Sequence, residues 1–233
     1  MGLFLNRRVL AVLFLGFSSG LPLALSGGTL QAWLTVEGVD IKTIGLFTLV
    51  GLPYTLKFLW SPLLDRYVVP LFGRRRGWIF VFQLLLLAMI FSMSVVSPVE
   101  APWVLAFFAI GLAFASSSQD IVIDAYRTEV LRAKERGLGA AVSVTGDRIA
   151  MLVSGALALI LSEIIGWRFT YMVMAGLMVV GMTATWLSPE PEEPGVPPKT
   201  LKEAIGGPLV EFFSREGAWA ILALIILYKL GDA

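Results

Sequence analysis

The sequence contains no cysteine and no histidine, and only 15% of its 233 residues are charged. Without cysteine, the chain can form no disulfide, no thiolate metal site and no cysteine nucleophile. Without histidine, it lacks the commonest metal ligand and general base, which argues against hydrolytic chemistry. A soluble domain carries about 25% charged residues. The shortage of charge, beside 57% hydrophobic residues, therefore indicates a protein surrounded by lipid, and we expect no cofactor and no metal.

Long apolar stretches dominate the chain. A membrane-spanning helix needs about 20 mostly apolar residues. Six segments qualify: Val9–Leu34, Thr43–Leu64, Trp78–Ser97, Trp103–Ile123, Leu138–Leu161 and Phe169–Leu187. The first exceeds the roughly 7–15 apolar residues of a signal peptide, so we interpret it as a retained helix. The sequence thus predicts an all-α, polytopic membrane protein.

The basic residues are distributed unevenly among the loops. The N-terminal segment and the loops after the second, fourth and sixth segments hold 2, 4, 4 and 3 of the 18 Lys and Arg residues, whereas the remaining loops hold 2. Because cytoplasmic loops carry the excess of basic residues, this pattern predicts a cytoplasmic N-terminus. The net charge of +1 gives no indication of a nucleic-acid partner.

The composition divides the chain into three parts. Residues 1–187 form the predicted six-helix bundle, residues 188–216 a proline-rich cytoplasmic linker with a short amphipathic segment, and residues 217–233 the start of a seventh helix. A disordered tether is the alternative for the amphipathic segment. Six helices, a cytoplasmic linker and the start of a seventh helix are typical of the first half of a twelve-helix transporter. In that architecture each half contains two inverted three-helix repeats. We therefore expect a fragment of a longer protein, unable to transport alone.

Ionisable side chains occur within the predicted spans. They are Lys57, Asp120, Asp124, Asp147 and Arg148. Such residues are costly in lipid and usually face a protein interior or an aqueous path, so they are expected to line a polar cavity. A Lys57–Asp120 or Arg148–Asp120 pair would lower that cost. A static salt bridge between helices remains an alternative to a transport role. The third and sixth segments carry no charge and are expected to face lipid.

One pattern imitates an enzyme motif. GFSSG at Gly16–Gly20 fits the nucleophile elbow of serine hydrolases. It lies within the first span, and the chain has no histidine to activate Ser18. The spacing of Gly16 and Gly20 instead favours a close contact between helices.

Several motifs resemble the major facilitator superfamily. KFLWSPLLDRY from Lys57 and FGRRRGW from Phe72 resemble its loop between helices two and three, which in that family forms a charge relay that controls alternating access. Asp65, Arg66 and the run Arg74, Arg75 and Arg76 match the relay. Ser61 replaces the usual glycine, and the chain has an insertion before Gly73. These departures resemble one branch, the AmpG-type muropeptide permeases and, more distantly, the acetyl-CoA transporters.

SSSQDIVIDAYRTEV from Ser116 and ERGLGAAVSV from Glu135 resemble the muropeptide permeases specifically. The resemblance implies proton-driven import of anhydromuropeptides across a bacterial inner membrane, by a protein that is monomeric when full length. Its partners would be the muropeptide, the proton and the bilayer. The residues expected to serve are Gln119, Asp120 and Asp124 for coupling or substrate, Lys57 and Arg148 as counter-charges, and Asp65, Arg66, Arg74, Arg75 and Arg76 for gating.

Tyr54 and Trp33 are expected either to stack on sugar rings or to lie at the membrane interface. Two other functions stay open at this point. A carrier of acetyl-CoA-like nucleotide thioesters would need more cations for the phosphates than Lys57 and Arg148. A membrane-embedded enzyme would need a base for Ser18.

Overall fold

The computed structural model describes residues 6–70, 72–191, 198 and 200–231, and every regular element in them is a helix. The chain divides into two units. The larger comprises Met1–Ser61 and Val68–Gly195, and the smaller Pro62–Tyr67 and Val196–Ala233. Each unit is described by itself below.

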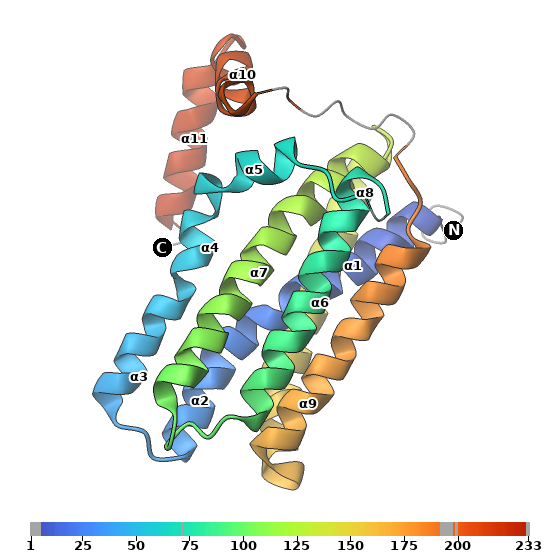
Figure 1. Cartoon of the computed structure of the whole chain (residues 1–233). Coiled ribbons are helices and arrows are strands. Elements are labelled where there is room, and N and C mark those ends of the chain that lie inside the picture. Colours follow the sequence, from blue (N-terminus) through green and yellow to red (C-terminus); the bar gives the residue numbers. More distant parts are fainter. Residues whose placement is uncertain (1–5, 71, 192–197, 199, 232–233) are drawn as a thin grey trace. The chain divides into compact units, whose positions relative to one another are not determined.

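The first predicted span lies at the centre of the larger unit and is interrupted. Helix α1 (Arg7–Ser26) ends at Gly27, whose backbone angles of −116° and −113° are non-helical, and α2 (Gly28–Val36) continues beyond it. The side chain of Asn6 caps α1 by accepting a hydrogen bond from the amide of Arg8. Helix α1 contacts α6, α7, α8 and α9, which lie around it in Figure 1.

The second predicted span is not one helix. It is divided into α3 (Ile41–Phe47), the 3₁₀ turn η1 (Thr48–Gly51), α4 (Leu52–Leu56), the 3₁₀ turn η2 (Lys57–Leu59) and α5 (Ser61–Arg66). The prediction of a continuous helix was therefore wrong. Gly45, Gly51 and Pro53 explain the difference, because glycine and proline are the weakest helix formers. The pieces η1, α4 and η2 pack along α7.

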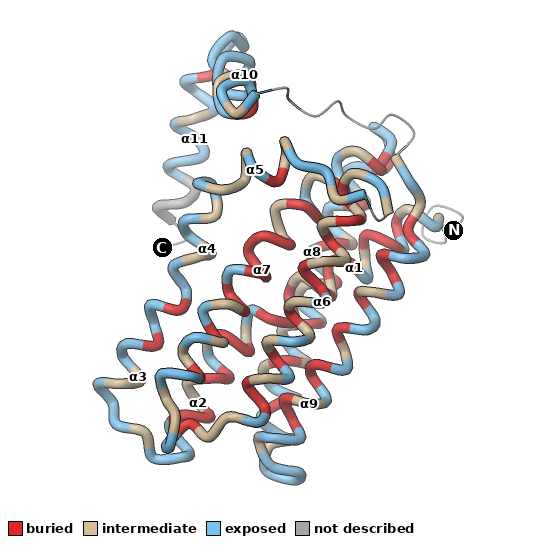
Figure 2. Tube along the Cα trace, in the orientation of Figure 1, coloured by how far each residue is buried: buried red, intermediate tan, exposed pale blue. Residues whose placement is uncertain are grey.

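Helices α6 (Arg74–Val95) and α7 (Pro102–Val130) correspond to the third and fourth predicted spans. Helix α6 packs on both α7 and α9. Both helices bury one side in the bundle, where the buried residues of α6 and α7 gather in Figure 2. Helix α6 is less buried than the α1–α2 run, which agrees with an outer position for it.

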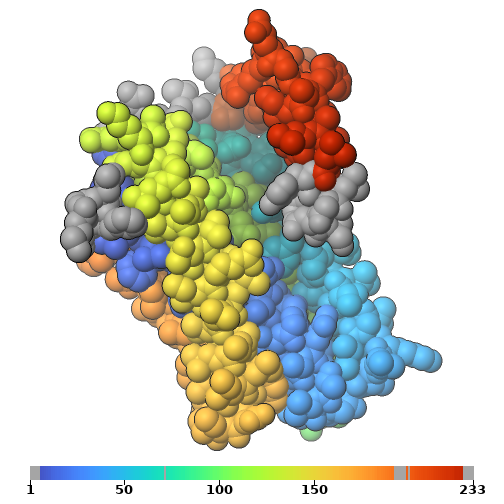
Figure 3. Space-filling model, turned by 180° about the vertical axis from the view of Figure 1, so that it is seen from behind, coloured from blue at the N-terminus to red at the C-terminus, as the bar shows by residue number. Residues whose placement is uncertain are grey.

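The fifth and sixth predicted spans are two helices that meet at Gly166, where the backbone angles of 79° and 160° are non-helical. Helix α8 (Arg136–Leu152) passes through a π-helical turn, η3 (Val153–Leu157), into α9 (Ala158–Leu187). Within α9 the chain bends at Gly166, whose φ of 79° is available to glycine but strained for other residues. Figure 3 shows the face on which α8 and η3 lie beside α1 and α2.

Four helical runs of the described chain are long and apolar enough to cross a membrane: Arg7–Val36, Arg74–Val95, Pro102–Val130 and Arg136–Leu187. The sequence predicts six spans. The difference arises because the second span is fragmented and the fifth and sixth meet at Gly166 without a loop. The architecture is that of an all-helical, multi-pass membrane protein.

The smaller unit contains two further helices. Helix α10 (Leu201–Phe213) begins after Thr200, whose hydroxyl accepts a hydrogen bond from the amide of Glu203 at 3.1 Å. It lies where the amphipathic segment is predicted. Helix α11 (Ala218–Gly231) begins where the seventh span is predicted to start.

Candidate functional site

Four polar side chains form a cluster inside the helix bundle. The Ser18 hydroxyl accepts hydrogen bonds from the amides of Gln83 at 3.2 Å and Gln119 at 3.4 Å, and Thr185 donates to Gln83 at 2.8 Å. These residues come from α1, α6, α7 and α9 and are at most 1% exposed. Gln119, expected to line a cavity, therefore faces the bundle interior. The Ser18 hydroxyl is thus bound by two glutamine amides inside the bundle, which gives it a structural role in place of the nucleophile role that the hydrolase motif implies.

Asp120 lies one residue beyond this cluster and has a different surrounding. It is half-buried and accepts a hydrogen bond from the hydroxyl of Ser19 on α1. The charges of Lys57, Asp124 and Asp147 act on it. The arrangement brings a cation and three carboxylates from η2, α7 and α8 into one electrostatic neighbourhood.

The expected ion pairs to Asp120 are not formed. Among the described residues, neither Lys57 nor Arg148 has a nitrogen within 4.0 Å of an Asp120 oxygen. Arg148 is exposed on α8 and approaches the sulfur of Met151 at 3.6 Å. The contact that Asp120 makes instead is with the Ser19 hydroxyl on α1.

Asp124 lies one helical turn after Asp120 on α7. Its side chain is 57% exposed and pairs with Arg127 at 3.0 Å, as the spacing of three residues predicts. Asp124 is therefore more accessible than Asp120 and already balanced by a cation on its own helix.

Helices α1 and α8 touch through their backbones. A Cβ atom on Gly16 would lie 2.4 Å from the carbonyl oxygen of Ser143, and one on Gly146 would lie 2.2 Å from that of Leu13. A Cβ atom on Gly20 would lie 2.6 Å from the Oδ1 atom of Asp147. The predicted helix contact at Gly16 and Gly20 is confirmed. It also brings the Asp147 carboxylate against α1, a placement that sequence reasoning missed.

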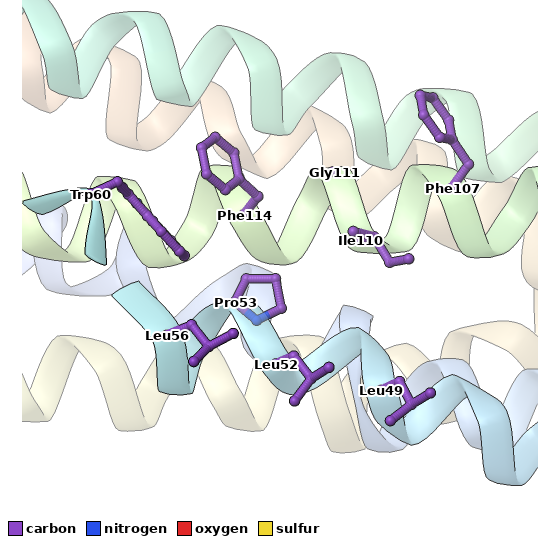
Figure 4. Close-up of a pocket in the computed structure, with 9 residues that line it drawn as sticks. All are labelled: Leu49, Leu52, Pro53, Leu56, Trp60, Phe107, Ile110, Gly111 and Phe114. Carbon is purple, nitrogen blue, oxygen red and sulfur yellow. The ribbon is translucent and has the colours of Figure 1, made fainter. Parts of the chain in front are cut away.

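A cavity of about 490 Å³ lies between α7 and the η1–α4–η2 pieces. Figure 4 shows its lining, which is apolar: Leu49, Leu52, Pro53, Leu56, Trp60, Phe107, Ile110, Gly111 and Phe114. None of the predicted site residues belongs to it. At one end Trp60 donates a hydrogen bond from its indole nitrogen to the Ser118 hydroxyl at 2.9 Å.

The two aromatic residues proposed for sugar stacking have different surroundings. Trp33 is 3% exposed and packs on Trp167 and Tyr171, with ring centroids 5.9 and 4.8 Å away. Its faces are occupied, so the expectation that it stacks on a sugar was wrong. Tyr54 shares a hydrogen bond of 3.2 Å with the Ser26 hydroxyl, which ties α4 to the end of α1.

Three consecutive arginines begin α6 and fix one end of the bundle. Arg75 is 7% exposed and binds Glu129 at 2.9 Å, which joins α6 to the end of α7, and Arg74 approaches the same carboxylate at 3.9 Å. Arg76 binds Glu190 at 2.6 Å and donates to the carbonyl oxygens of Thr185 and Trp186. The three arginines therefore join the start of α6 to the ends of α7 and α9.

The same end contains further contacts that sequence reasoning missed. Glu135 accepts a hydrogen bond from Asn6 at 2.6 Å and lies 4.0 Å from Arg8, while Tyr126 donates to the carbonyl oxygen of Pro189 at 2.6 Å. Two of the acidic residues, Glu129 and Glu135, lie in a strongly basic segment, whereas Glu190 lies in the proline-rich linker. That coincidence was the available signal. We call this end of the larger unit, where α1 begins and α9 ends, the basic end.

The remaining gating candidates belong to the smaller unit. Asp65 and Arg66 lie at the end of α5, and the Arg66 guanidinium lies 5.4 Å from the ring centre of Tyr67. Their role relative to Arg74, Arg75 and Arg76 stays a prediction.

Residues 12–230 match the family model described as the Major Facilitator Superfamily. An anhydromuropeptide permease of Escherichia coli strain K12 is 55% identical over 99% of this chain and 47% of its own length. An uncharacterized protein of Haemophilus influenzae is 40% identical over 98% of this chain and 55% of its own. "Putative transporter AmpG 4" of Rickettsia felis is 34% identical over 99% of this chain and 58% of its own. The chain spans about half the length of the curated relatives it matches.

Proposed function

Because the chain belongs to the Major Facilitator Superfamily, we propose that it forms the first half of a proton-coupled transporter that imports anhydromuropeptides into bacteria. The activity is proposed for the complete transporter, since the relatives are about twice as long. The permease of Escherichia coli supports the substrate class. No relative named above supports the nucleotide-thioester alternative.

The observation that carries the proposal is the setting of Asp120. A carboxylate inside a membrane bundle is costly when charged, and such residues usually mark the path of a substrate, an ion or a proton. It is bound to α1 through Ser19 and lies near the cation of Lys57. A group placed this way can carry a proton, while Lys57 balances its charge in the deprotonated state.

The basic end supplies the second element of the proposal. Alternating access requires contacts that hold one end of the bundle closed and can be exchanged. We assign this role to the Arg75–Glu129 and Arg76–Glu190 pairs, because the first joins α6 to α7 and the second joins α6 to the segment after α9 through charged groups. Asp65 and Arg66 are assigned to the same gate, as the family resemblance implies.

We also propose that the chain lies in the bacterial inner membrane with a cytoplasmic N-terminus, on the basis of the loop charges. The absence of cysteine makes this directly testable. In intact spheroplasts, a membrane-impermeant maleimide should label Lys42→Cys but not Lys134→Cys. The reverse labelling would contradict the orientation.

The function is tested by uptake of labelled anhydromuropeptide into membrane vesicles that contain the complete transporter. We expect uptake driven by a proton gradient, and loss of uptake in Asp120→Asn with normal membrane insertion. Asp40→Asn, which changes an exposed carboxylate in a loop, is the matched control and should transport normally. Normal uptake by Asp120→Asn would remove Asp120 from the mechanism. Competition by acetyl-CoA would contradict the substrate class.

A further inference from the structure

Three consecutive residues of α1 contact different neighbours at one level of the bundle. Ser18 belongs to the buried cluster with Gln83 and Gln119, Ser19 donates to Asp120 on α7, and Gly20 lies against Asp147 on α8. Helix α1 therefore passes between two carboxylates and binds one of them directly. A change in the charge of Asp120 therefore acts directly on α1, through the hydrogen bond from Ser19.

Ser19 is the described hydrogen-bond partner of the Asp120 carboxylate. The charged groups that act on Asp120 come from three elements: Lys57 from η2, Asp124 from α7 itself and Asp147 from α8. Lys57 is the cation among them, and within the described part of the chain it forms no ion pair with Asp120. The hydroxyl thus makes the contact that fixes where the carboxylate points.

A serine hydroxyl can serve both protonation states of a carboxyl group. It donates to the charged carboxylate, and it can accept from the protonated acid, because a hydroxyl carries both a hydrogen and lone pairs. Hydrogen bonds to a charged group are roughly twice as strong as those between neutral groups. Proton binding therefore keeps the contact between α1 and α7 but weakens it.

We propose that Ser19 is the positioning residue of the proton site, which holds Asp120 against α1 and transmits its protonation to that helix. The inference rests on the proposed function, in which Asp120 carries the proton. It names Ser19 as the residue that couples proton binding at Asp120 to the central helix α1. It also assigns Ser19 and Ser18 different roles, because Ser18 belongs to the buried cluster.

The first test measures the pH dependence of anhydromuropeptide uptake by the complete transporter in vesicles. Loss of the donor in Ser19→Ala disfavours the charged carboxylate, so the alkaline limb of the pH profile should move to higher pH by about one unit or more. Ser19→Thr keeps the hydroxyl and should restore the original profile. Ser26→Ala is the matched control, since its hydroxyl contacts Tyr54 instead, and its profile should stay unchanged.

The second test does not need transport. Infrared spectra of the 233-residue chain in nanodiscs record the C=O stretch of protonated carboxyl groups, which responds to hydrogen bonding. The band that disappears in Asp120→Asn should change its frequency and its titration midpoint in Ser19→Ala, but not in Ser26→Ala. An unchanged band in Ser19→Ala would overturn the inference.

The two tests separate the possible failures. Absence of uptake by the unmodified complete transporter contradicts the proposed function, and the infrared result then decides the role of Ser19 by itself. If uptake occurs and the pH profile of Ser19→Ala equals that of the unmodified protein, the positioning role is refuted while the transport function stands. Equal shifts in Ser19→Ala and Ser26→Ala would likewise refute a specific role.

Discussion

Thr29 of α2 donates its hydroxyl hydrogen to the carbonyl oxygen of Ser154, 2.7 Å away in the π-helical turn η3. Both residues are buried, at 3% and 0% exposure. A π-helical turn and a helix break both leave backbone groups without their usual partners, which is costly where no water is present. The Thr29 hydroxyl satisfies one of these groups, and it joins the interruption of the first span to that of the fifth.

Thr29→Val should therefore destabilise the bundle. The variant keeps the shape of the side chain but leaves the Ser154 carbonyl without this donor, and interhelical hydrogen bonds in membranes contribute about 0.6–2 kcal/mol. Thermal unfolding in detergent micelles measures the effect. Thr35→Val is the matched control, because the Thr35 hydroxyl bonds only to Gln31 of its own exposed helix face. Equal melting temperatures for the two variants would contradict the role of Thr29.

The backbone contact between α1 and α8 predicts a strong effect of very small substitutions. Gly16→Ala and Gly146→Ala place a methyl group within 2.4 and 2.2 Å of a carbonyl oxygen, so the helices must separate. Overpacking of this kind costs about 1–3 kcal/mol. Gly176→Ala in α9 meets no atom within 4 Å and should be neutral or stabilising, because alanine is the better helix former. The three melting temperatures in micelles test this difference.

At the basic end, Arg75→Gln should weaken the contact between α6 and α7. The Arg75 and Glu129 side chains are only 8% and 17% exposed, so the variant leaves a largely buried carboxylate with a weaker partner. We expect a loss of about 2 kcal/mol or more. The exposed pair of Arg215 and Glu211 is the comparison, and Arg215→Gln should cost less than about 0.5 kcal/mol. Chemical denaturation measures the free energy of unfolding of both variants. Similar losses for Arg75→Gln and Arg215→Gln would show that burial of the Arg75–Glu129 pair does not strengthen it.

The loop before α3 should respond to acid. The hydroxyl and amide of Thr43 donate to Asp40 and lower the pKa of its carboxyl below the usual 3.8, and the amide of Lys42 also donates to it. Because the folded-state pKa is lowered, this cap stabilises α3 above the unfolded pKa, and its contribution is lost as the pH falls through the folded pKa. The protection of the Lys42 and Thr43 amides from hydrogen exchange, relative to their intrinsic rates at each pH, should therefore fall as the pH drops from 5 through the lowered pKa of Asp40. Asp40→Asn should show a smaller pH effect, and an equal effect would exclude the carboxylate as the cause.

The sequence predicts the helical bundle because apolar length is a local property. It also predicts the contact at Gly16 and Gly20, since two glycines four residues apart create a flat helix face. The interruptions were harder to foresee. The break at Gly27 follows Pro22 and falls in the run Ser26–Gly28, a turn signal that the apolar length of the span outweighed in the prediction. The VSGAL segment of η3 has no composition that distinguishes a π turn from an ordinary helix.

The partners of the charged residues depend on rotation between distant helices. Neighbouring residues on a helix point about 100° apart, so a rotation of α1 by about that angle would exchange Ser18 for Ser19 as the partner of Asp120. The sequence contains no information that fixes this angle by itself. For the same reason Arg75, and not Arg76, proved to be the buried partner of Glu129, and Lys57 proved not to be in contact with Asp120.

The central position of α1 has a consequence for how the protein is made. Ser19 and Asp120 are 101 residues apart, so at a synthesis rate of roughly 5–20 residues per second α1 waits for its α7 partner for about 5–20 seconds. During that time α7, α8 and α9, three of the helices that contact it, are still missing. Its span carries hydroxyl groups and no ionisable side chain, whereas Asp120 and Asp147 are supplied by later helices. The central helix α1 is thus one that can remain in the membrane until the later helices of this chain arrive.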